Sequence, residues 1–546
     1  MNKVSERKGK MQVGLAEILY FFSFGIMFAA KGVGLDYGQK LFTLCICFSL
    51  LCLAGKLWLT KHTAKEWLVM LLLVLLGVGI YLKSGEQAAL AAMLVIIGMK
   101  NVPLDRLFKV CLGIWGMTFA LSCTLGILHI RDGVVVVHQK LGLGPLIRWS
   151  LGYTHPNVLH VSYFVLASLL LYAGDYHGKK LWRATTLLFV GNILVFLYSV
   201  SYTGVLIMTG YLALNVYLDM RKSLSRPEKF LLQCILPFCV LFPLIGPFVT
   251  SGKVFDFFNK LLSTRFELVK NFFTNFTPSL LGTRAHFDTT AHLTLDSSFA
   301  YLLMYYGIIA FVIFVAGYFF VVRKLIKEMK NKELAIMIAI IVAGVTEQFL
   351  FNLSFKNLSF FFLGEYFFEY MQKAGNRTSV WNREIRLPGS GGRDLCLPDI
   401  VSAVKRACAN RDRHRTGNVA GIVIAAFLAA VICAGTVHMP ESVYVNRGLT
   451  EYKKPEEEVS LDLDRVPEGF NSMVIGYEGP EAGMYCFSGN IIKMEYVRNI
   501  AGAAVLGAFA AWLCTWIHAF ATAYRKGQNG AADRSVGESN ESAYRK

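Results

Sequence analysis

The chain has 546 residues, of which 55% are hydrophobic and only 17% are charged. A soluble domain usually carries about 25% charged residues, so this composition excludes an ordinary soluble protein. The net charge of +18 would suggest nucleic acid in a soluble protein, but the basic residues fall mostly on alternate loops between apolar segments. We therefore expect no nucleic-acid partner.

Long apolar segments recur along the chain, and about 20 apolar residues are needed for a helix to cross roughly 30 Å of hydrocarbon. One of them, from Trp67 to Leu82, contains no charged residue. The predicted spans are 12–30, 41–59, 67–83, 87–99, 107–128, 157–174, 184–200, 204–219, 230–249, 297–322, 334–350, 356–371, 418–437 and 499–522. The sequence thus predicts an all-α polytopic membrane protein, with a bundle of about twelve spans and a two-span C-terminal appendage.

The Lys and Arg residues indicate the orientation, because they gather on cytoplasmic loops. With the N-terminus inside, the basic loops fall on the cytoplasmic side, near 56–65, 100–106, 179–183, 221–229, 323–332 and 372–416. This pattern predicts that both termini are cytoplasmic. No small-residue cleavage site precedes a soluble domain, so we interpret the first span as uncleaved.

The predicted spans divide the chain into parts with different roles. A membrane domain covers 1–372, a basic cytoplasmic linker covers 373–416, the two-span appendage covers 417–525, and a polar tail covers 526–546. We expect the tail to be disordered. Three outer segments are long: loop A at 129–156, loop B at 250–296, and the acidic loop C at 438–498.

Loop A ends in His155-Pro156-Asn157 at the mouth of the sixth predicted span. Pro suits the first position of a helix because its missing N–H would be unpaired there, so these residues are also typical of a plain helix start. The loop carries Arg131 and Arg148 on the side that is otherwise poor in cations. A cationic outer loop favours an anionic, membrane-bound substrate.

Loop B mixes cations, carboxylates and histidines, namely Arg265, Glu267, Lys270, Arg284, His286, Asp288, His292 and Asp296. Arg makes forked hydrogen bonds to phosphate oxygens, and His and Asp can transfer protons, although an ordinary solvated loop has a similar composition. The His and Asp spacing is not a standard ligand pattern, so we expect no metal site. Residues 254–274 have the amphipathic pattern of a helix lying on the membrane interface.

Glu347 is an ionisable residue within an apolar segment near the predicted outer face. Such residues are costly to bury and are usually functional or paired, and the alternative is a helix-end carboxylate that faces water. The seventh predicted span also ends at the predicted outer face, at Ser201–Gly204.

Several of these segments match one family in their order and in their placement relative to the spans. They are Arg148–Asn157, Asn259–Arg265 with Leu281 and Gly282, Asp296–Leu303 with Tyr306, Gly307 and Ile308, and Glu347 with Asn352 and Asn357. Over about residues 12–372 the chain resembles the Wzy-type bacterial polysaccharide polymerases, the family of O-antigen, capsule and exopolysaccharide polymerases. It departs from them at Tyr202, where related proteins often have an arginine.

The resemblance implies glycosyl transfer at the outer leaflet of the bacterial cytoplasmic membrane. The donor would be a growing glycan on a polyprenyl diphosphate, and the acceptor a single lipid-linked repeat unit. The acceptor's terminal sugar hydroxyl would attack the donor's anomeric carbon. Because the leaving group is already activated, no cofactor and no metal are expected. A chain-length regulator and a flippase are possible partners.

The resemblance also implies roles for individual residues. The substrate-binding candidates are Arg148 and Arg265 for the diphosphate, Arg284 in reserve, and Asn157 and Asp296. The catalytic base would be His155, His292 or Glu347, and the sequence does not choose between them.

Two other functions are kept as alternatives. A lipid-linked glycan ligase would share the architecture and transfer the finished glycan to another acceptor. A flippase or other transporter would be no enzyme, but it should carry charges deep within its spans and have short outer loops. The appendage loosely resembles chain-length regulators of polysaccharide export, and the alternative that we favour is an appendage of unknown purpose.

Overall fold

A computed structural model describes residues 10–36, 38–127, 130, 135–140, 144–287, 294–373, 380–385, 394–398, 415–439, 443–445, 473–478, 481–486, 489–512 and 514–515. The protein has two compact units. The larger one, which we call the helical body, comprises Gln12–Val134 and Trp149–Leu395. The smaller one, the C-terminal unit, comprises Met1–Met11, Val135–Arg148 and Cys396–Lys546.

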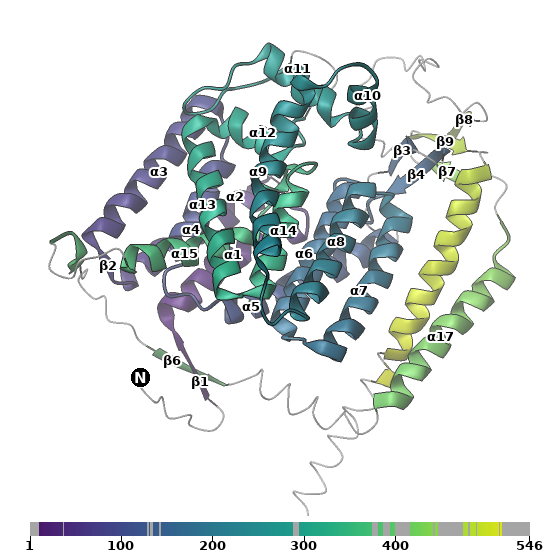
Figure 1. Ribbon diagram of the computed structural model, residues 1–546. Coiled ribbons are helices and arrows are strands. Elements are labelled where there is room, and N and C mark those ends of the chain that lie inside the picture. Colours follow the sequence, from purple (N-terminus) through teal and green to yellow (C-terminus); the bar gives the residue numbers. More distant parts are fainter. Residues whose placement is uncertain are drawn as a thin grey trace, which may run out of the picture. The chain divides into compact units, whose positions relative to one another are not determined.

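Helices form most of the helical body (Figure 1). They are α1 Leu15–Gly32, α2 Lys40–Leu59, α3 Ala64–Ser84, α4 Ala88–Gly98, α5 Leu104–Ile127, α6 Pro156–Gly174, α7 Gly178–Ser199, α8 Tyr202–Asp219, α9 Arg226–Val249, α10 Gly252–Leu261, α11 Arg265–Asn275, α12 Ser298–Tyr301, α13 Gly307–Glu328, α14 Asn331–Ala343 and α15 Ser359–Lys373. A π-helical turn, Leu302–Tyr306, joins α12 to α13, and 3-10 turns occupy Gln348–Leu350 and Val380–Asn382.

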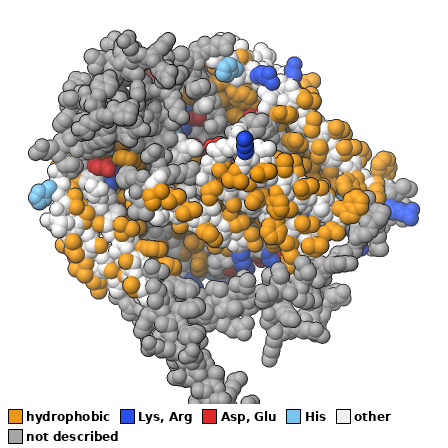
Figure 2. All heavy atoms as spheres, turned by 180° about the vertical axis from the view of Figure 1, so that it is seen from behind, with side chains coloured by type: hydrophobic (Ala, Val, Ile, Leu, Met, Phe, Trp, Pro, Cys, Tyr) orange, Lys and Arg blue, Asp and Glu red, His pale blue; other side chains and the backbone are white. Residues whose placement is uncertain are grey.

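Within the described residues, eight helices are long and apolar enough to cross a membrane. They are α1, α2, α3, α5, α6, α7, α9 and the continuous helical segment Ser298–Glu328. Hydrophobic side chains are widespread on the face shown in Figure 2, and α2 and α3 expose leucines such as Leu51 and Leu75. The protein is therefore an all-α, multi-pass membrane protein.

The helix boundaries follow most of the predicted apolar segments closely, with two differences. The helix at 489–512 begins ten residues before the predicted span 499–522, so the predicted loop C (438–498) is wrong at its C-terminal end. The segment 334–350 was expected to be a single span, but α14 ends at Ala343 and the chain stays largely irregular until α15 begins at Ser359. Hydropathy does not reveal this break, because the segment is still rich in Phe and Leu. Side-chain hydrogen bonds, including one from Asn357 Nδ2 to Leu350 O at 2.8 Å, satisfy backbone groups that a helix would have paired.

Local sequence explains several helix starts. Thr63 and Glu66 form a capping box at the start of α3, and Ser225 and Glu228 form another at the start of α9. His155 caps α6, with its Nδ1 accepting the backbone N–H of Asn157 at 3.1 Å, and Pro156 follows in the first turn. The interpretation of this triplet as a helix start is confirmed.

The core of the body is centred on α14. This helix packs against α8, α9 and α13, and every residue from Leu334 to Ile341 is buried. Aromatic side chains fill the space between other helices; for example, Trp115 of α5 stacks on Phe28 of α1 with ring centroids 4.3 Å apart. The body is thus a close-packed bundle, and the irregular segment after α14 starts from its most buried helix.

Strands are few and short in the part of the chain that the structure describes. In the body, β2 (His62–Thr63) pairs antiparallel with β5 (Glu384–Ile385), and His62 lies opposite Ile385. The strands β1 (Lys10–Gly14) and β6 (Asp394–Pro398) form another pair.

The C-terminal unit combines two helices with small sheets. Helix α17 (Arg415–Thr436) packs on a helix at 489–512, where a Cβ placed on Gly507 would lie only 2.6 Å from Ala429 Cβ. The strands are β3 Val135–Lys140 and β4 Gly144–Trp149, which pair with each other, and β7 Val443–Val445, β8 Met473–Glu478 and β9 Glu481–Cys486, in the order β7-β9-β8. A stretch of predicted loop A, Val135–Arg148, therefore clusters with the predicted appendage.

Candidate functional site

Arg265 is held at the first position of α11 by an unusual turn. The two preceding residues, Ser263 and Thr264, both have left-handed backbone angles, with φ of 53° and 67°. The turn is closed by a hydrogen bond of 2.7 Å from Thr264 N to Asn259 O. The Arg265 side chain is buried, and it donates from Nε to Thr346 O at 2.6 Å and from Nη1 to Leu262 O at 3.0 Å.

Two carboxylates lie near the third nitrogen of this guanidinium, Nη2. Arg265 Nη2 lies 3.3 Å from Asp296 Oδ2 and 3.6 Å from Glu347 Oε1. The Glu347 side chain is 12% exposed and that of Asp296 is 29% exposed, so the ion pairs are partly shielded from solvent. One cation between two anions leaves the group with a formal excess of one negative charge.

Glu347 also receives hydrogen bonds from the first turns of two other helices. Thr203 Oγ1 of α8 donates to Glu347 Oε1 at 2.9 Å, and Asn157 Nδ2 of α6 donates to the same oxygen at 3.4 Å. Ser298, the first residue of α12, donates its hydroxyl to the Glu347 carbonyl oxygen. The N-termini of α6, α8, α11 and α12 thus meet at Glu347, and their partial positive charges favour an anion there.

The segment that carries Glu347 is fixed at both ends. Ser298 N donates to Gly344 O at 2.8 Å, and Asn357 donates to Tyr318 Oη at 2.9 Å as well as to Leu350 O. Phe355 takes a left-handed conformation, with φ of 57°. An irregular backbone buried in protein needs such pairing, so the position of Glu347 is set by contacts with α12 and α13.

Most of the predicted site residues within the helical body are brought together here. Asn157, Arg265, Asp296 and Glu347 come from separate segments and make one cluster through the contacts above. We call these four residues and Thr203 the Glu347 cluster. His155 caps α6 beside it, with Nδ1 receiving the N–H of Asn157.

The contacts described above do not include three other predicted residues. Arg148 belongs to the C-terminal unit, where it is buried near the end of β4. Arg284 is exposed, and its guanidinium lies against Gly85, which follows α3. His292 lies outside the described residues.

Sequence reasoning missed several participants. In the segment Ser201–Gly204 the sequence analysis singled out Tyr202, whereas the neighbouring Thr203 contacts Glu347. A second carboxylate, Glu86, accepts a hydrogen bond from Tyr301 Oη, and Tyr301 lies one helical turn after Ser298 on α12. Burial raises the pKa of the Glu86 carboxyl, although the hydrogen bonds from Tyr301 and Ala88 act in the opposite direction.

Lys356 is a further residue that the sequence did not single out. It is only 5% exposed, and its Nζ lies 5.9 Å from the centroid of the Trp115 ring and 6.0 Å from that of Tyr153. Aromatic faces stabilise a cation in this way. Lys356 therefore places a buried amine in the same irregular segment that carries Glu347.

The backbones at Gly282 and Gly307, two glycines singled out in the sequence, cross in close contact. Gly307 has φ of +84°, and a Cβ at this position would lie 2.2 Å from Gly282 N. Ile308 N donates to Ser279 O at 3.0 Å, and Thr283 N donates to Met304 O at 2.8 Å. The loop around Gly282 is thus fastened to the helix break that precedes α13.

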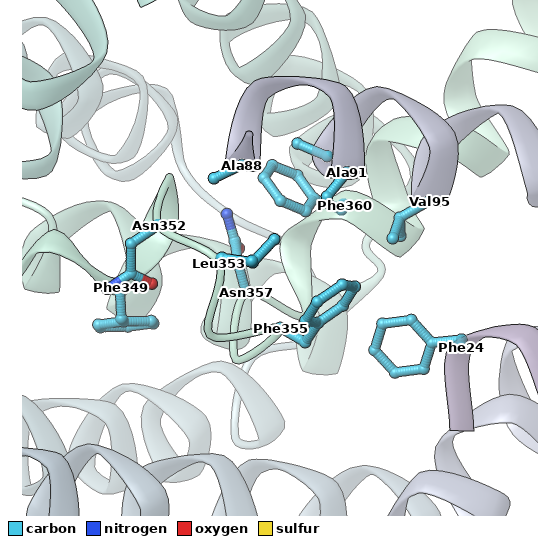
Figure 3. Close-up of a pocket in the computed structure, with 11 residues that line it drawn as sticks. Phe24, Ala88, Ala91, Val95, Phe349, Asn352, Leu353, Phe355, Asn357 and Phe360 are labelled. Atoms are coloured by element: carbon cyan, nitrogen blue, oxygen red, sulfur yellow. The ribbon is translucent and has the colours of Figure 1, made fainter. Parts of the chain in front are cut away.

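The same irregular segment borders an apolar cavity. A small pocket beside it is lined by side chains from α1, α4 and the segment, including Phe24, Ala91 and Phe355 (Figure 3). These three residues also line a larger cavity of about 370 Å³ among α1, α2, α3 and α4. The larger cavity has a mostly hydrophobic wall with a few polar groups, such as Tyr81 and Gln87.

Chemically, the Glu347 cluster supplies one guanidinium and two carboxylates that can accept a proton. Arg265 offers forked donors to phosphate oxygens, and a carboxylate can act as a general base. Among the described side chains, no group of three or more His, Cys, Asp and Glu residues has the arrangement of a metal site. Comparison with protein-family models, curated proteins and solved structures finds no match for this chain.

Proposed function

We propose that this protein is a membrane glycosyltransferase that polymerises polyprenyl-diphosphate-linked oligosaccharide repeat units into surface polysaccharide. The observation that supports this proposal most is the buried guanidinium of Arg265, placed where helix N-termini meet and shared by Asp296 and Glu347. A diphosphate needs such a fixed cation, and a glycosyl acceptor needs a nearby base.

The proposed reaction uses these groups as follows. Arg265 binds the diphosphate of the donor, whose oxygens compete with the carboxylates for the guanidinium. The acceptor's sugar hydroxyl attacks the anomeric carbon of the donor, and Glu347 takes the hydroxyl proton. The bond between the anomeric carbon and the phosphate oxygen breaks, and the electron pair leaves with the polyprenyl diphosphate. Asn157 and Thr203 orient Glu347 through their hydrogen bonds.

Two features outside the cluster support a lipid-linked substrate. The cavity of about 370 Å³ among α1 to α4 offers an apolar volume for part of an isoprenoid chain. Helix α10 exposes Val254, Phe257 and Leu261, which suits a helix lying on the membrane surface beside the site.

The charge distribution supports placing the cluster at the outer leaflet. Helices α6 and α8 begin at the cluster, and their far ends meet the start of α14: Lys332 pairs with Asp175, and Asn331 Nδ2 donates to Leu218 O. That far end also carries basic residues such as Arg221 and Lys222. Lys and Arg favour the cytoplasmic side, so the cluster would face outward.

Replacement of Arg265 tests the proposal. Arg265→Ala should abolish polymer, because no other group of the cluster supplies a cation to the diphosphate, while the protein still reaches the membrane. Arg265→Lys should restore only part of the activity, since an ammonium lacks the fork of donors. The matched control is Lys270→Ala, an exposed cation of the same helix, which should give normal polymer. Normal polymer from Arg265→Ala would remove this residue from the mechanism.

The alternative functions are separated by deleting the gene and analysing the glycans that remain. Single repeat units left on the lipid at the outer face indicate a polymerase. Full-length polymer left on the lipid indicates a ligase, and repeat units trapped on the inner face indicate a flippase. The buried ionic cluster lies at helix ends, an arrangement that favours surface chemistry over transport.

A further inference from the structure

His160 is a fully buried histidine at the point where α6, α7 and α8 meet. It lies one helical turn after Asn157 on α6. Its Nδ1 lies 3.0 Å from Ser199 Oγ at the end of α7, and its Nε2 lies 2.7 Å from Asn192 Oδ1 on the same helix. The first turn of α8 packs on the ring, because a Cβ at Gly204 would lie only 2.4 Å from His160 Cγ. Polar groups buried in membrane helices are costly and are usually paired or functional, and the proposed mechanism does not yet use this one.

The hydrogen bonds around the ring determine which of its nitrogens carries the proton. Asn192 Nδ2 donates to Val205 O at 3.2 Å. Because a carbonyl oxygen can only accept, the amide orientation of Asn192 is fixed, and its Oδ1 must accept the Nε2–H of His160. The neutral ring then accepts at Nδ1 from the hydroxyl of Ser199, whose oxygen accepts the backbone N–H of Ser201 at 3.4 Å. Both ring nitrogens are thus engaged in structural hydrogen bonds, and neither is available to take a proton from a substrate.

The turn between α7 and α8 needs support from outside itself. Val200 has a left-handed φ of 42°, a conformation that is unfavourable for a β-branched residue. Such strain persists only where the surrounding contacts determine the backbone firmly. His160 supplies contacts on both sides of Val200, directly at Ser199 and through Asn192 at Val205 O. The ring therefore holds the turn that leads into α8.

Each of the two helices that start beside His160 provides one hydrogen-bond donor to Glu347. Thr203 Oγ1, in the first turn of α8, donates to Glu347 Oε1 at 2.9 Å, and Asn157 Nδ2, in the first turn of α6, donates to the same oxygen at 3.4 Å. Two hydrogen bonds to one oxygen require a fixed spacing between the two helix starts. All of these residues belong to the helical body.

We propose that His160 is a positioning residue, which holds the first turns of α6 and α8 together so that Asn157 and Thr203 orient the carboxylate of Glu347. The inference rests on the proposed function, because it concerns the base of that reaction. His160 acts through the helices and does not itself touch substrate. Loosening the turn should slow the chemical step, while Arg265 still binds the diphosphate.

The experiment measures kcat and KM of the full chain in lipid nanodiscs, with a synthetic lipid-linked repeat unit as substrate. His160→Phe fills the space of the ring but removes both hydrogen bonds. It should lower kcat about tenfold, as expected for the loss of about one net hydrogen bond, with KM changed less than about twofold. His160→Gln keeps an N–H for Asn192 Oδ1 and should restore part of kcat.

Tyr163→Phe is the matched control. It removes the hydrogen bond of 2.8 Å from Tyr163 Oη to Leu188 O, which joins the same two helices, α6 and α7, one turn farther from the Glu347 cluster. This variant loses a buried contact of similar size but keeps the turn at Ser199, so it should leave kcat and KM unchanged.

A double-mutant cycle separates positioning of Glu347 from a general loss of packing. Thr203→Val removes the hydroxyl that contacts Glu347, and in this background His160→Phe should lower kcat by less than about threefold, because its effect passes through Thr203. An equal loss in both backgrounds would overturn the inference. So would a rise in KM at constant kcat, or a loss in Tyr163→Phe as large as that in His160→Phe.

Hydrogen–deuterium exchange of the same variants reports on the turn without requiring activity. The amides of 199–205 should exchange faster in His160→Phe than in the wild type or in Tyr163→Phe, and unchanged exchange would refute the role of His160. If the wild-type chain itself does not polymerise the substrate, the proposed function fails, while the exchange result still decides whether His160 holds the turn. If His160→Phe does not fold, His160→Gln supplies both measurements.

Discussion

At the scale of single residues, the catalytic role that we propose for Glu347 rests on its neighbours. Thr203 and Asn157 donate to its Oε1, and Arg265 lies 3.6 Å from the same oxygen. Glu347→Gln keeps the shape of the side chain but removes the charge and the ability to take a proton. We expect the rate of polymer formation in vitro to fall by about 100-fold or more, as for the loss of a general base. Glu267→Gln, at an exposed position of α11, is the control and should retain the wild-type rate. Activity of Glu347→Gln within threefold of the wild type would return the choice of base to His155 and His292.

Glu86 gives the folded state a stability that depends on pH. Burial raises the pKa of this carboxyl, so the folded state favours its protonated form. The corresponding stability is present at low pH and is lost as the pH rises through the raised pKa, because the buried group must then ionise. Glu86→Gln removes this loss. The melting temperature of the variant relative to the wild type should therefore be higher at pH 7.5 than at pH 5, as measured by thermal unfolding in detergent. A difference that does not change with pH would contradict the argument.

The residues of the Glu347 cluster also show what sequence can predict at this scale. Asn157, Arg265, Asp296 and Glu347 were selected because each belongs to a motif with a family resemblance, and the structure brings all of them together. Thr203 does not stand out in the sequence, because a lone threonine at a helix start is also a common capping residue. The Thr203 hydroxyl reaches Glu347 only because α8 packs beside the segment after α14. No local sequence pattern predicts this long-range contact. Arg148 looked equivalent to Arg265 in sequence, yet it lies in the C-terminal unit.

At the scale of elements, the crossing of Gly282 and Gly307 allows a direct test of the packing around the helix break. Gly307 has φ of +84°, and a Cβ there would lie 2.2 Å from Gly282 N and 2.6 Å from Leu280 O. Gly307→Ala should lower the stability by about 1–3 kcal/mol or more, because both the backbone angle and the contact are unfavourable. Gly113→Ala is the matched control, since Gly113 lies in α5 with nothing within 4 Å of a Cβ, and it should be neutral or slightly stabilising. Thermal unfolding of the purified variants measures both effects, and equal melting temperatures would show that the crossing is not rigid.

The elements themselves were largely predictable, because apolar length and helix-start signals are local properties. The break after Ala343 was not, since its causes are contacts from distant residues. Ser298 and Tyr318 pair with the irregular segment from α12 and α13, and neither contact is visible in the hydropathy of 344–358. The helix of the predicted span 334–350 thus ends at Ala343, and Glu347 lies in the irregular segment between α14 and α15.

At the scale of the whole molecule, the division into units was beyond sequence reasoning. Arg498 donates a hydrogen bond to Ile147 O, but the two residues are 351 residues apart in the chain, and no charge pattern or motif links them. The sequence suggested a membrane domain at 1–372 followed by a separate appendage. The C-terminal unit instead includes Val135–Arg148, a stretch from the middle of the first predicted domain. Long-range contacts of this kind depend on the packed structure, and composition does not report them.

The orientation of the molecule in the membrane is the condition on which the proposed chemistry depends. Helices α6 and α8 begin at the Glu347 cluster and end near basic residues, so we expect from the positive-inside rule that the cluster faces outward. A cysteine at Lys253, an exposed residue of α10, should react in intact cells with a membrane-impermeant maleimide. A cysteine at Lys222, in the exposed turn after α8, should react only after the cells are permeabilised. The unsubstituted chain, labelled in parallel, accounts for its native cysteines. Because a lipid-linked donor and acceptor must meet on the same side as Arg265 and Glu347, the reverse labelling pattern would exclude polymerisation at the outer leaflet by this cluster.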